Sequence, residues 1–246
     1  MTQENNLDYQ ARCDLAAAHR LAVMDGLNEG SWNHFSLVSP SNPTHMMITP
    51  GDTHWSQVRA SNLAVMGPQA EMVSGPRKPN DAAWIIHYPL HRARKDAKCV
   101  LHAHTPYATA LSARKSARLD TRSSQAAASF HDDVAYFDLY DGILRAEEEG
   151  ERMAEILGGK RVLMMRNHGV VVTGESVGHA YLSLYLLERA CQFQLLATGN
   201  GGHELNQIPE EVAAHIGREN RKPTSGDRHF QGMKEVLAEK DPGYVN

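Results

Sequence analysis

The spacing of apolar residues along the chain predicts alternating helices and strands. Residues 8–25 are rich in alanine, and Leu15, Ala18 and Ala22 recur at intervals of three to four, which predicts an amphipathic helix. A longer apolar stripe of the same period predicts a helix over residues 176–197. Further helices are predicted over residues 80–94, 105–113 and 147–159. Proline removes a helical hydrogen bond, so Pro89 should kink or split the first of these three.

Short apolar runs separated by Pro, Asn, Ser and Gly predict the strands. They lie at residues 34–38, 45–49, 63–66, 98–104, 134–138 and, as two strands broken at Asn167-His168-Gly169, at 161–174. This order predicts an α/β fold with a central, mostly antiparallel sheet and helices outside it. The C-terminal residues are polar, and we expect residues 218–229 to form a loose segment.

Composition narrows the class of protein. The 246 residues are 41% hydrophobic and 22% charged, which predicts one domain over residues 1–246, with a core at about 8–200 and a polar tail at about 201–246. The net charge of -4, without a block of basic residues, argues against a nucleic-acid partner. No signal-peptide pattern or membrane-length apolar run is present, so we expect no membrane partner. The three separated cysteines are typical of reduced residues in a cytoplasmic protein.

Two histidines of the strand at 98–104 carry the first sign of chemistry. His102 and His104 are two residues apart, so they share one face of the strand, whereas Cys99 faces the opposite side. Such a pair alone is more often two half-buried strand histidines. His168 adds a third imidazole at a glycine-flanked strand break. Catalytic zinc typically has three protein ligands and one open position, so we predict a divalent ion on these three histidines. Zinc is the default, with manganese, cobalt or nickel as alternatives.

These segments resemble the class II aldolase/adducin family. The resemblance rests on "CVLHAHTPYATALSA" (99–113), "HDDVAYFD" (131–138) and "RNHGVVVTGESVGHAYLSLYLLERA" (166–190), and it extends over roughly residues 8–200. It implies a three-layer α/β/α fold around a nine-stranded, mainly antiparallel sheet. It also implies a homotetramer with a divalent metal on three histidines near subunit interfaces. Members include sugar-phosphate aldolases, an epimerase, a dehydratase and decarboxylases, as well as adducin, whose homologous domain is not known as an enzyme.

The sequence departs from the family's aldolases at the phosphate site and at the catalytic base. Their Ser-Ser-Glu run before the histidine pair reads Asp81-Ala82-Ala83 here, so Ala83 replaces the acid/base glutamate. Their Gly-Asn phosphate contact reads Asn33-His34, and their Thr-Gly contact reads Gly51-Asp52. The added carboxylates would repel a phosphate dianion, and these stretches contain no new cation to offset them. We therefore expect a substrate without phosphate.

The loss of the glutamate favours decarboxylation over aldol chemistry. An aldol reaction needs a base that removes a C–H or O–H proton, whereas a keto or hydroxy-aromatic acid can lose CO2 without one. We predict a metal-dependent carbon–carbon lyase, most simply a decarboxylase, acting on a small carboxylate. Two alternatives stay open: an aldolase of a hydroxy-keto compound with a relocated base, and an adducin-like non-catalytic binding domain. The intact histidine triad favours an enzyme.

Seven further residues are candidates for the site. For proton transfer, Asp81 is a candidate relay, although it suits a helix N-cap equally well. His34 is a candidate for the relocated base. The resemblance implies that a tyrosine near the C-terminus, here Tyr244, enters the neighbouring subunit's site. The candidate substrate-binding residues are Asn33, Asp52, Arg77 and His87.

Overall fold

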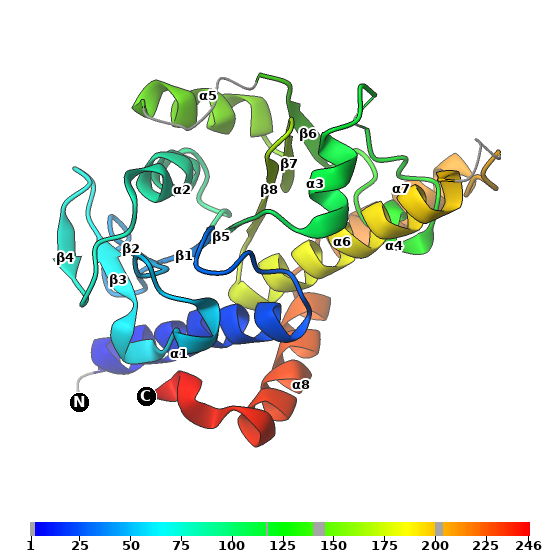
Figure 1. Ribbon diagram of the computed structural model, residues 1–246. Coiled ribbons are helices and arrows are strands. Elements are labelled where there is room, and N and C mark those ends of the chain that lie inside the picture. Colours follow the sequence, from blue (N-terminus) through cyan, green and yellow to red (C-terminus); the bar gives the residue numbers. More distant parts are fainter. Residues whose placement is uncertain (1–2, 117, 140–145, 200–203) are drawn as a thin grey trace.

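The computed structural model describes residues 3–116, 118–139, 146–199 and 204–246, and a single sheet forms its centre (Figure 1). The described strands are β1 (His34–Val38), β2 (Met46–Ile48), β3 (Ala64–Met66), β4 (Met72–Ser74), β5 (Cys99–Ala103), β6 (Val134–Phe137), β7 (Val162–Met165) and β8 (Gly169–Gly174). Their order is β4-β3-β2-β1-β5-β8-β7-β6. Every neighbouring pair is antiparallel except β6 and β7. The mainly antiparallel sheet is confirmed, with eight described strands where nine were expected.

The structure describes eight helices, of which the first, second, third, fifth and sixth lie close to their predicted positions. They are α1 (Gln3–Met24), α2 (Asp81–Ala93), α3 (Pro106–Ser112), α4 (Gln125–Ala128), α5 (Glu147–Leu157), α6 (Val177–Thr198), α7 (Glu210–Asn220) and α8 (Thr224–Lys240), with short 3-10 turns at Trp55–Gln57, Ala60–Asn62 and Pro242–Val245. The edge strand β4 and the single-turn helix α4 were not predicted, since each is too short to show a period. No helix among these described segments is both long and apolar enough to span a membrane.

Two hydrophobic cores, one on each face of the sheet, confirm the three-layer architecture (Figure 1). Helices α1, α3, α6 and α8 cover one face, and α2 and α5 cover the other. Alternate residues of a strand therefore enter different cores. In β5, Cys99, Leu101 and Ala103 belong to the α1/α6 side, whereas Val100 belongs to the α2/α5 side. By the same alternation His102 lies on the α2 side, which places its imidazole in the layer between the sheet and α2.

Helix α2 continues through Pro89 as one helix, so the predicted split is wrong. Proline has no N–H to donate to the carbonyl of Ile85, four residues earlier, and that carbonyl faces α5. Gly150 of α5 packs so closely there that an added Cβ would lie 2.0 Å from that carbonyl oxygen and 2.9 Å from the Pro89 ring. Tight packing against α5 thus holds the proline-containing segment in a helix.

The prediction of a loose segment at residues 218–229 is wrong, because this stretch is helical apart from a short turn after Asn220. Helix α8 buries Phe230 and Leu237 in the α1/α6 core. It approaches α6 closely at two glycines, Gly178 of α6 and Gly226 of α8. A Cβ on Gly226 would lie 2.6 Å from the Cα of His179. The predicted boundary between core and tail, at residues 200–201, lies outside the described residues.

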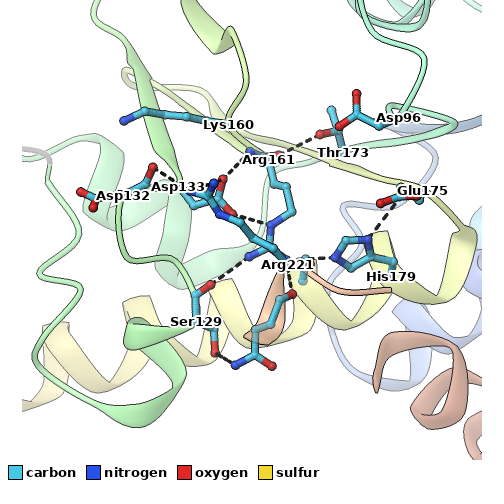
Figure 2. A network of polar contacts seen from close by, with 12 residues as sticks. Asp96, Ser129, Asp132, Asp133, Lys160, Arg161, Thr173, Glu175, His179 and Arg221 are labelled. Carbon is cyan, nitrogen blue, oxygen red and sulfur yellow. Dashed lines mark hydrogen bonds and ion pairs between the residues drawn. The ribbon is translucent and has the colours of Figure 1, made fainter. Parts of the chain in front are cut away.

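A buried polar network fixes the end of α7 to the sheet (Figure 2). The Arg161 guanidinium pairs with the buried carboxylate of Asp133 and donates to the Ser129 carbonyl at 2.9 Å and the Asn220 carbonyl at 2.7 Å. Arg221 lies 3.4 Å from the same carboxylate. A buried ion pair is favourable only when its remaining hydrogen bonds are also satisfied, and here the end of α7 supplies two of the partners.

Buried histidines should make the folded state sensitive to acid. His19 of α1 is fully buried; its Nδ1 bonds the Leu15 carbonyl at 2.7 Å and its Nε2 the Thr49 hydroxyl at 2.7 Å. Burial lowers the pKa of His19 to about 4 from 6.5. The unfolded chain therefore binds a proton that the folded chain excludes, and folding stability falls as pH drops from 7 towards 4.

Between pH 7 and pH 5 the parent should lose free energy of unfolding because His19 stays neutral when folded but is protonated when unfolded. We predict that His19→Gln avoids about 2 kcal/mol of this loss, which is roughly what the lowered pKa of His19 is worth over this interval. The measurement is urea unfolding at both pH values, with the exposed His215→Gln as control. An equal loss in the parent and His19→Gln would contradict the prediction.

Candidate metal centre

The three predicted metal ligands meet at one end of β5. His102 belongs to β5, His104 follows that strand, and His168 lies in the turn between β7 and β8. Pairing of β5 with β8 sets Ala103 opposite Val170, so the turn lies beside the strand end. The ring centroids are 5.0, 5.0 and 4.6 Å apart, and one nitrogen of each ring lies within 4.8 Å of the other two.

The backbone conformation of the residues on either side of His168 brings its ring to the other two histidines. Asn167 adopts a left-handed conformation with φ 55°, which asparagine tolerates better than most residues. A Cβ on Gly169 would lie 2.6 Å from the Ala103 carbonyl oxygen and 2.8 Å from the His104 ring. Only glycine therefore lets the turn approach β5 closely enough to bring His168 to the other two histidines.

Hydrogen bonds to the Nδ1 atoms leave the Nε2 atoms of two histidines available as ligands. His102 Nδ1 bonds the Val170 carbonyl at 3.0 Å, and His104 Nδ1 bonds Glu29 Oε2 at 2.6 Å. Outer partners of this kind orient metal-binding imidazoles. His104 Nε2 is buried and has no hydrogen-bond partner. A buried nitrogen without a partner is costly, so this atom fits a site built for a metal ion.

The protonation state of the cluster also suits a cation. Burial lowers the pKa of His102 well below its ordinary value, and it lowers the pKa of His168 to about 4, with the neighbouring His104 as a second cause. Both imidazoles are therefore neutral at neutral pH. Neutral imidazole is the form that binds a metal.

A buried carboxylate of α6 secures the segment that follows His104. Glu188 accepts hydrogen bonds from the Thr105 hydroxyl at 2.6 Å and from the backbone N–H groups of Tyr107 and Ala108 at 2.8 Å. These N–H groups belong to the first turn of α3, where a negative charge is stabilising. Glu188 thus anchors the chain directly after His104.

A pocket of about 210 Å³ adjoins the cluster. It is lined by Ser31, Trp32, Asn33, His34, Thr49, Pro50, Gly51, Asp52, Lys78, Pro79, Asn80 and Ala83. Two of these residues also contact the triad: the Asn33 side-chain oxygen accepts from His104 N–H at 3.1 Å, and the His34 ring centroid lies 5.1 Å from that of His102. A substrate in this pocket would lie next to the ligand cluster.

The structure brings most of the predicted substrate-site residues to this pocket. Asn33, His34 and Asp52 line it, and Ala83 lines it where the resembling aldolases have their glutamate. The Arg77 guanidinium bonds the Asp52 carbonyl at 3.1 Å, at the rim. His87 is fully buried behind the pocket, where its Nε2 bonds His34 Nδ1 at 2.9 Å.

Two predicted catalytic residues are not brought to the pocket of this chain. The Asp81 side chain is 85% exposed and lies 3.2 Å from the Lys78 ammonium group. Its alternative interpretation as an N-cap is wrong, since Asn80 accepts the capping bond from Ala83 N–H at 2.8 Å. Tyr244 is buried in a different cavity, which Cys13 of α1 and Lys234 of α8 also line.

Sequence reasoning missed several residues of the site. Glu29 and Glu188 orient the ligand segment, yet no spacing links either residue to the histidines. Trp32 lines the pocket, and its side chain is 68% exposed. The one available signal was position, since Trp32 directly precedes the Asn33-His34 pair that had already been singled out.

Comparison with known proteins identifies the relatives of this site. The family model for the class II aldolase and adducin N-terminal domain matches residues 13–195. The decarboxylase NovR of Streptomyces niveus is 35% identical over 84% of this chain and 76% of its own length. A 4-hydroxy-3-prenylphenylpyruvate oxygenase/4-hydroxy-3-prenylbenzoate synthase of Streptomyces roseochromogenus is 34% identical over 84% of this chain and 74% of its own.

Two further matches define the fold and the range of functions. A solved structure of an aldolase II superfamily protein from Pseudomonas syringae is 33% identical, with a TM-score of 0.90, over 98% of this chain and 96% of that one. Mouse alpha-adducin is 39% identical over 80% of this chain, which corresponds to 27% of the adducin. Relatives thus include both named enzymes and a longer protein of another kind.

We predict that Glu29→Ala weakens zinc binding by about 10- to 100-fold, because it removes the partner that orients His104. His102→Ala should abolish stoichiometric binding. The measurement is zinc competition against a chromophoric chelator, with the exposed Glu219→Ala as control. Unchanged affinity in Glu29→Ala would contradict the orienting role, and unchanged metal content in His102→Ala would contradict the ligand assignment itself.

Proposed function

Because this chain belongs to the class II aldolase and adducin family, we propose that it is a divalent-metal-dependent carbon–carbon lyase that removes CO2 from a small, non-phosphorylated keto or hydroxy-aromatic acid. One observation carries the proposal. The histidine triad is assembled with its orienting partners, while the adjoining pocket presents Ala83 where the resembling aldolases use a glutamate.

The residues that would hold the metal are His102, His104 and His168. A divalent ion bound there would act as a Lewis acid towards a substrate oxygen, and zinc is the default ion for three nitrogen ligands. The protein contributes the geometry: Glu29 and the Val170 carbonyl hold two rings in place.

The pocket suits a reaction without proton abstraction from carbon. When CO2 leaves, the C–C bond breaks and its electron pair stays on the substrate, so the only proton required is one supplied to carbon afterwards. Among the pocket-lining residues, Asp52 is the single carboxylate, and it is exposed. This arrangement supports decarboxylation more directly than aldol cleavage.

The pocket also suits an aromatic acid. Trp32 offers an exposed indole at the mouth, and planar rings stack favourably on indole. Lys78 also lines the pocket, although its ammonium group is paired with Asp81. One relative is named a decarboxylase, and another is named for hydroxy-aromatic acids. These observations together favour a hydroxy-aromatic acid among the candidate substrates.

We predict CO2 release from at least one keto acid or hydroxybenzoate, measured with protein loaded separately with zinc, manganese, cobalt, nickel or ferrous iron. His104→Ala should lower the rate by about 100-fold or more, because it removes electrostatic stabilisation at the reacting oxygen. The parent, with Ala83 in place, should be active without oxygen.

Three outcomes would contradict this proposal. Efficient metal-dependent cleavage of a sugar phosphate, with no CO2 from any acid, would favour an aldolase with a relocated base. A strict requirement for oxygen would favour an oxygenase, as one relative is named. Metal binding without turnover of any acid or sugar would favour the adducin-like binding domain.

We further propose that the protein is cytoplasmic, and that it assembles as a homotetramer, as the resemblance implies. All three cysteines are free and buried, which suits a reducing compartment. Light scattering at micromolar concentration should give about four times the 27.2 kDa chain mass. A monomer would contradict the assembly.

A further inference from the structure

A line of buried polar side chains extends from the pocket through the layer between the sheet and α2. His34 and Ser36 of β1 face α2, which contributes His87 and His91. His34 Nδ1 bonds His87 Nε2 at 2.9 Å, and His87 Nδ1 bonds the Ser36 hydroxyl. The same hydroxyl bonds His91 Nε2 at 2.7 Å. Finally, His91 Nδ1 bonds the carbonyl of Ala97 at 2.6 Å. We call these four side chains the histidine relay.

The Ala97 carbonyl sets the direction of every hydrogen bond in the histidine relay. A carbonyl only accepts, so His91 must carry its proton on Nδ1. Neutral His91 then presents an acceptor at Nε2, and the Ser36 hydroxyl must donate to it. The alternative acceptor for that hydroxyl, the Val100 carbonyl, is 3.5 Å away and therefore much weaker.

The same reasoning extends to the pocket. Since the Ser36 hydrogen is used on His91, the Ser36 oxygen accepts from His87, which must carry its proton on Nδ1. Neutral His87 then accepts at Nε2, so His34 must donate from Nδ1. A neutral His34 with its proton on Nδ1 has an unprotonated Nε2. His34 lines the pocket, and its Nδ1 is occupied, so Nε2 is the nitrogen available to a ligand.

The two rings that α2 contributes to the histidine relay, His87 and His91, are neutral. Burial lowers the pKa of His91 to about 4, and it lowers the pKa of His87 well below its ordinary value.

We propose that the histidine relay holds His34 as a hydrogen-bond acceptor towards the pocket, and that the group bound there is a hydroxyl of the substrate. Ser36, His87 and His91 are positioning residues, since they act on a ligand only through His34. The assignment of the hydroxyl rests on the proposed function, because it specifies part of that substrate. The orientation of the hydrogen bonds does not rest on it.

The orientation is tested by ¹⁵N NMR of histidine-labelled, zinc-loaded protein. The expected result is an unprotonated Nε2 and a protonated Nδ1 in His34, His87 and His91. In Ser36→Ala, His87 loses its acceptor at Nδ1, so its proton should move to Nε2 and that of His34 should move to Nε2 as well. His91→Phe should reverse His34 in the same way, since the freed Ser36 hydroxyl then donates to His87.

The matched control is His45→Phe, which removes another partly buried histidine outside the histidine relay and should leave His34 unchanged. A protonated Nε2 of His34 in the parent would overturn the proposal. An unreversed His34 in both Ser36→Ala and His91→Phe would overturn it as well.

The hydroxyl is tested by binding 2-, 3- and 4-hydroxybenzoate and the matching fluorobenzoates to zinc-loaded protein by calorimetry. Fluorine is close in size to a hydroxyl group but cannot donate. At least one hydroxybenzoate should bind about fivefold or more tightly than its fluoro analogue, and Ser36→Ala should reduce this preference to less than about twofold. No preference in the parent, together with the expected NMR result, would overturn the substrate assignment alone. Absence of CO2 release would instead contradict the proposed function and leave both results intact.

Discussion

The antiparallel pairing of β5 with β8 sets Ala103 opposite Val170, and the site depends on this register. A shift by one residue would turn His102 to the α1/α6 face and would separate it from the Val170 carbonyl. The register is fixed from both sides, because β5 also pairs with β1, where His34 lies opposite His102. Strand β5, which contains His102 and leads to His104, is therefore held between β8, which begins at the His168 turn, and β1, which begins at the pocket residue His34.

The sequence predicted the triad because its signal is local. A same-face histidine pair and a glycine-flanked histidine can be recognised without knowledge of the fold, and Gly169 proves to be the residue that lets the turn approach His104. Glu29 could not be found in this way. Its carboxylate reaches His104 from a turn after α1, across 75 positions of sequence, and only the tertiary structure brings the two together.

The C-terminal helices could not be predicted from the sequence. Residues 218–229 are polar, and composition alone indicated a loose segment. Their order comes from contacts with distant partners: the glycines of α6 and α8 allow close approach, and the Asn220 carbonyl accepts from the buried Arg161. A glycine in a sequence gives no indication of what it approaches, and a lone arginine gives no indication of its burial. The central, mostly antiparallel sheet with helices outside it, by contrast, followed from strand and helix periods, whereas the three layers followed from the family resemblance.

Burying the polar layer between the sheet and α2 costs desolvation free energy unless each polar group has a hydrogen-bond partner, whereas apolar side chains of the same volume need none. The structure satisfies it with hydrogen bonds that all run in one direction from the Ala97 carbonyl. That direction requires neutral rings, and burial keeps them neutral. The same burial that holds the histidine relay in one tautomer also holds the ligands His102 and His168 unprotonated. One physical cause, burial from water, thus accounts both for the neutral imidazoles of the candidate metal centre and for the neutral rings of His87 and His91.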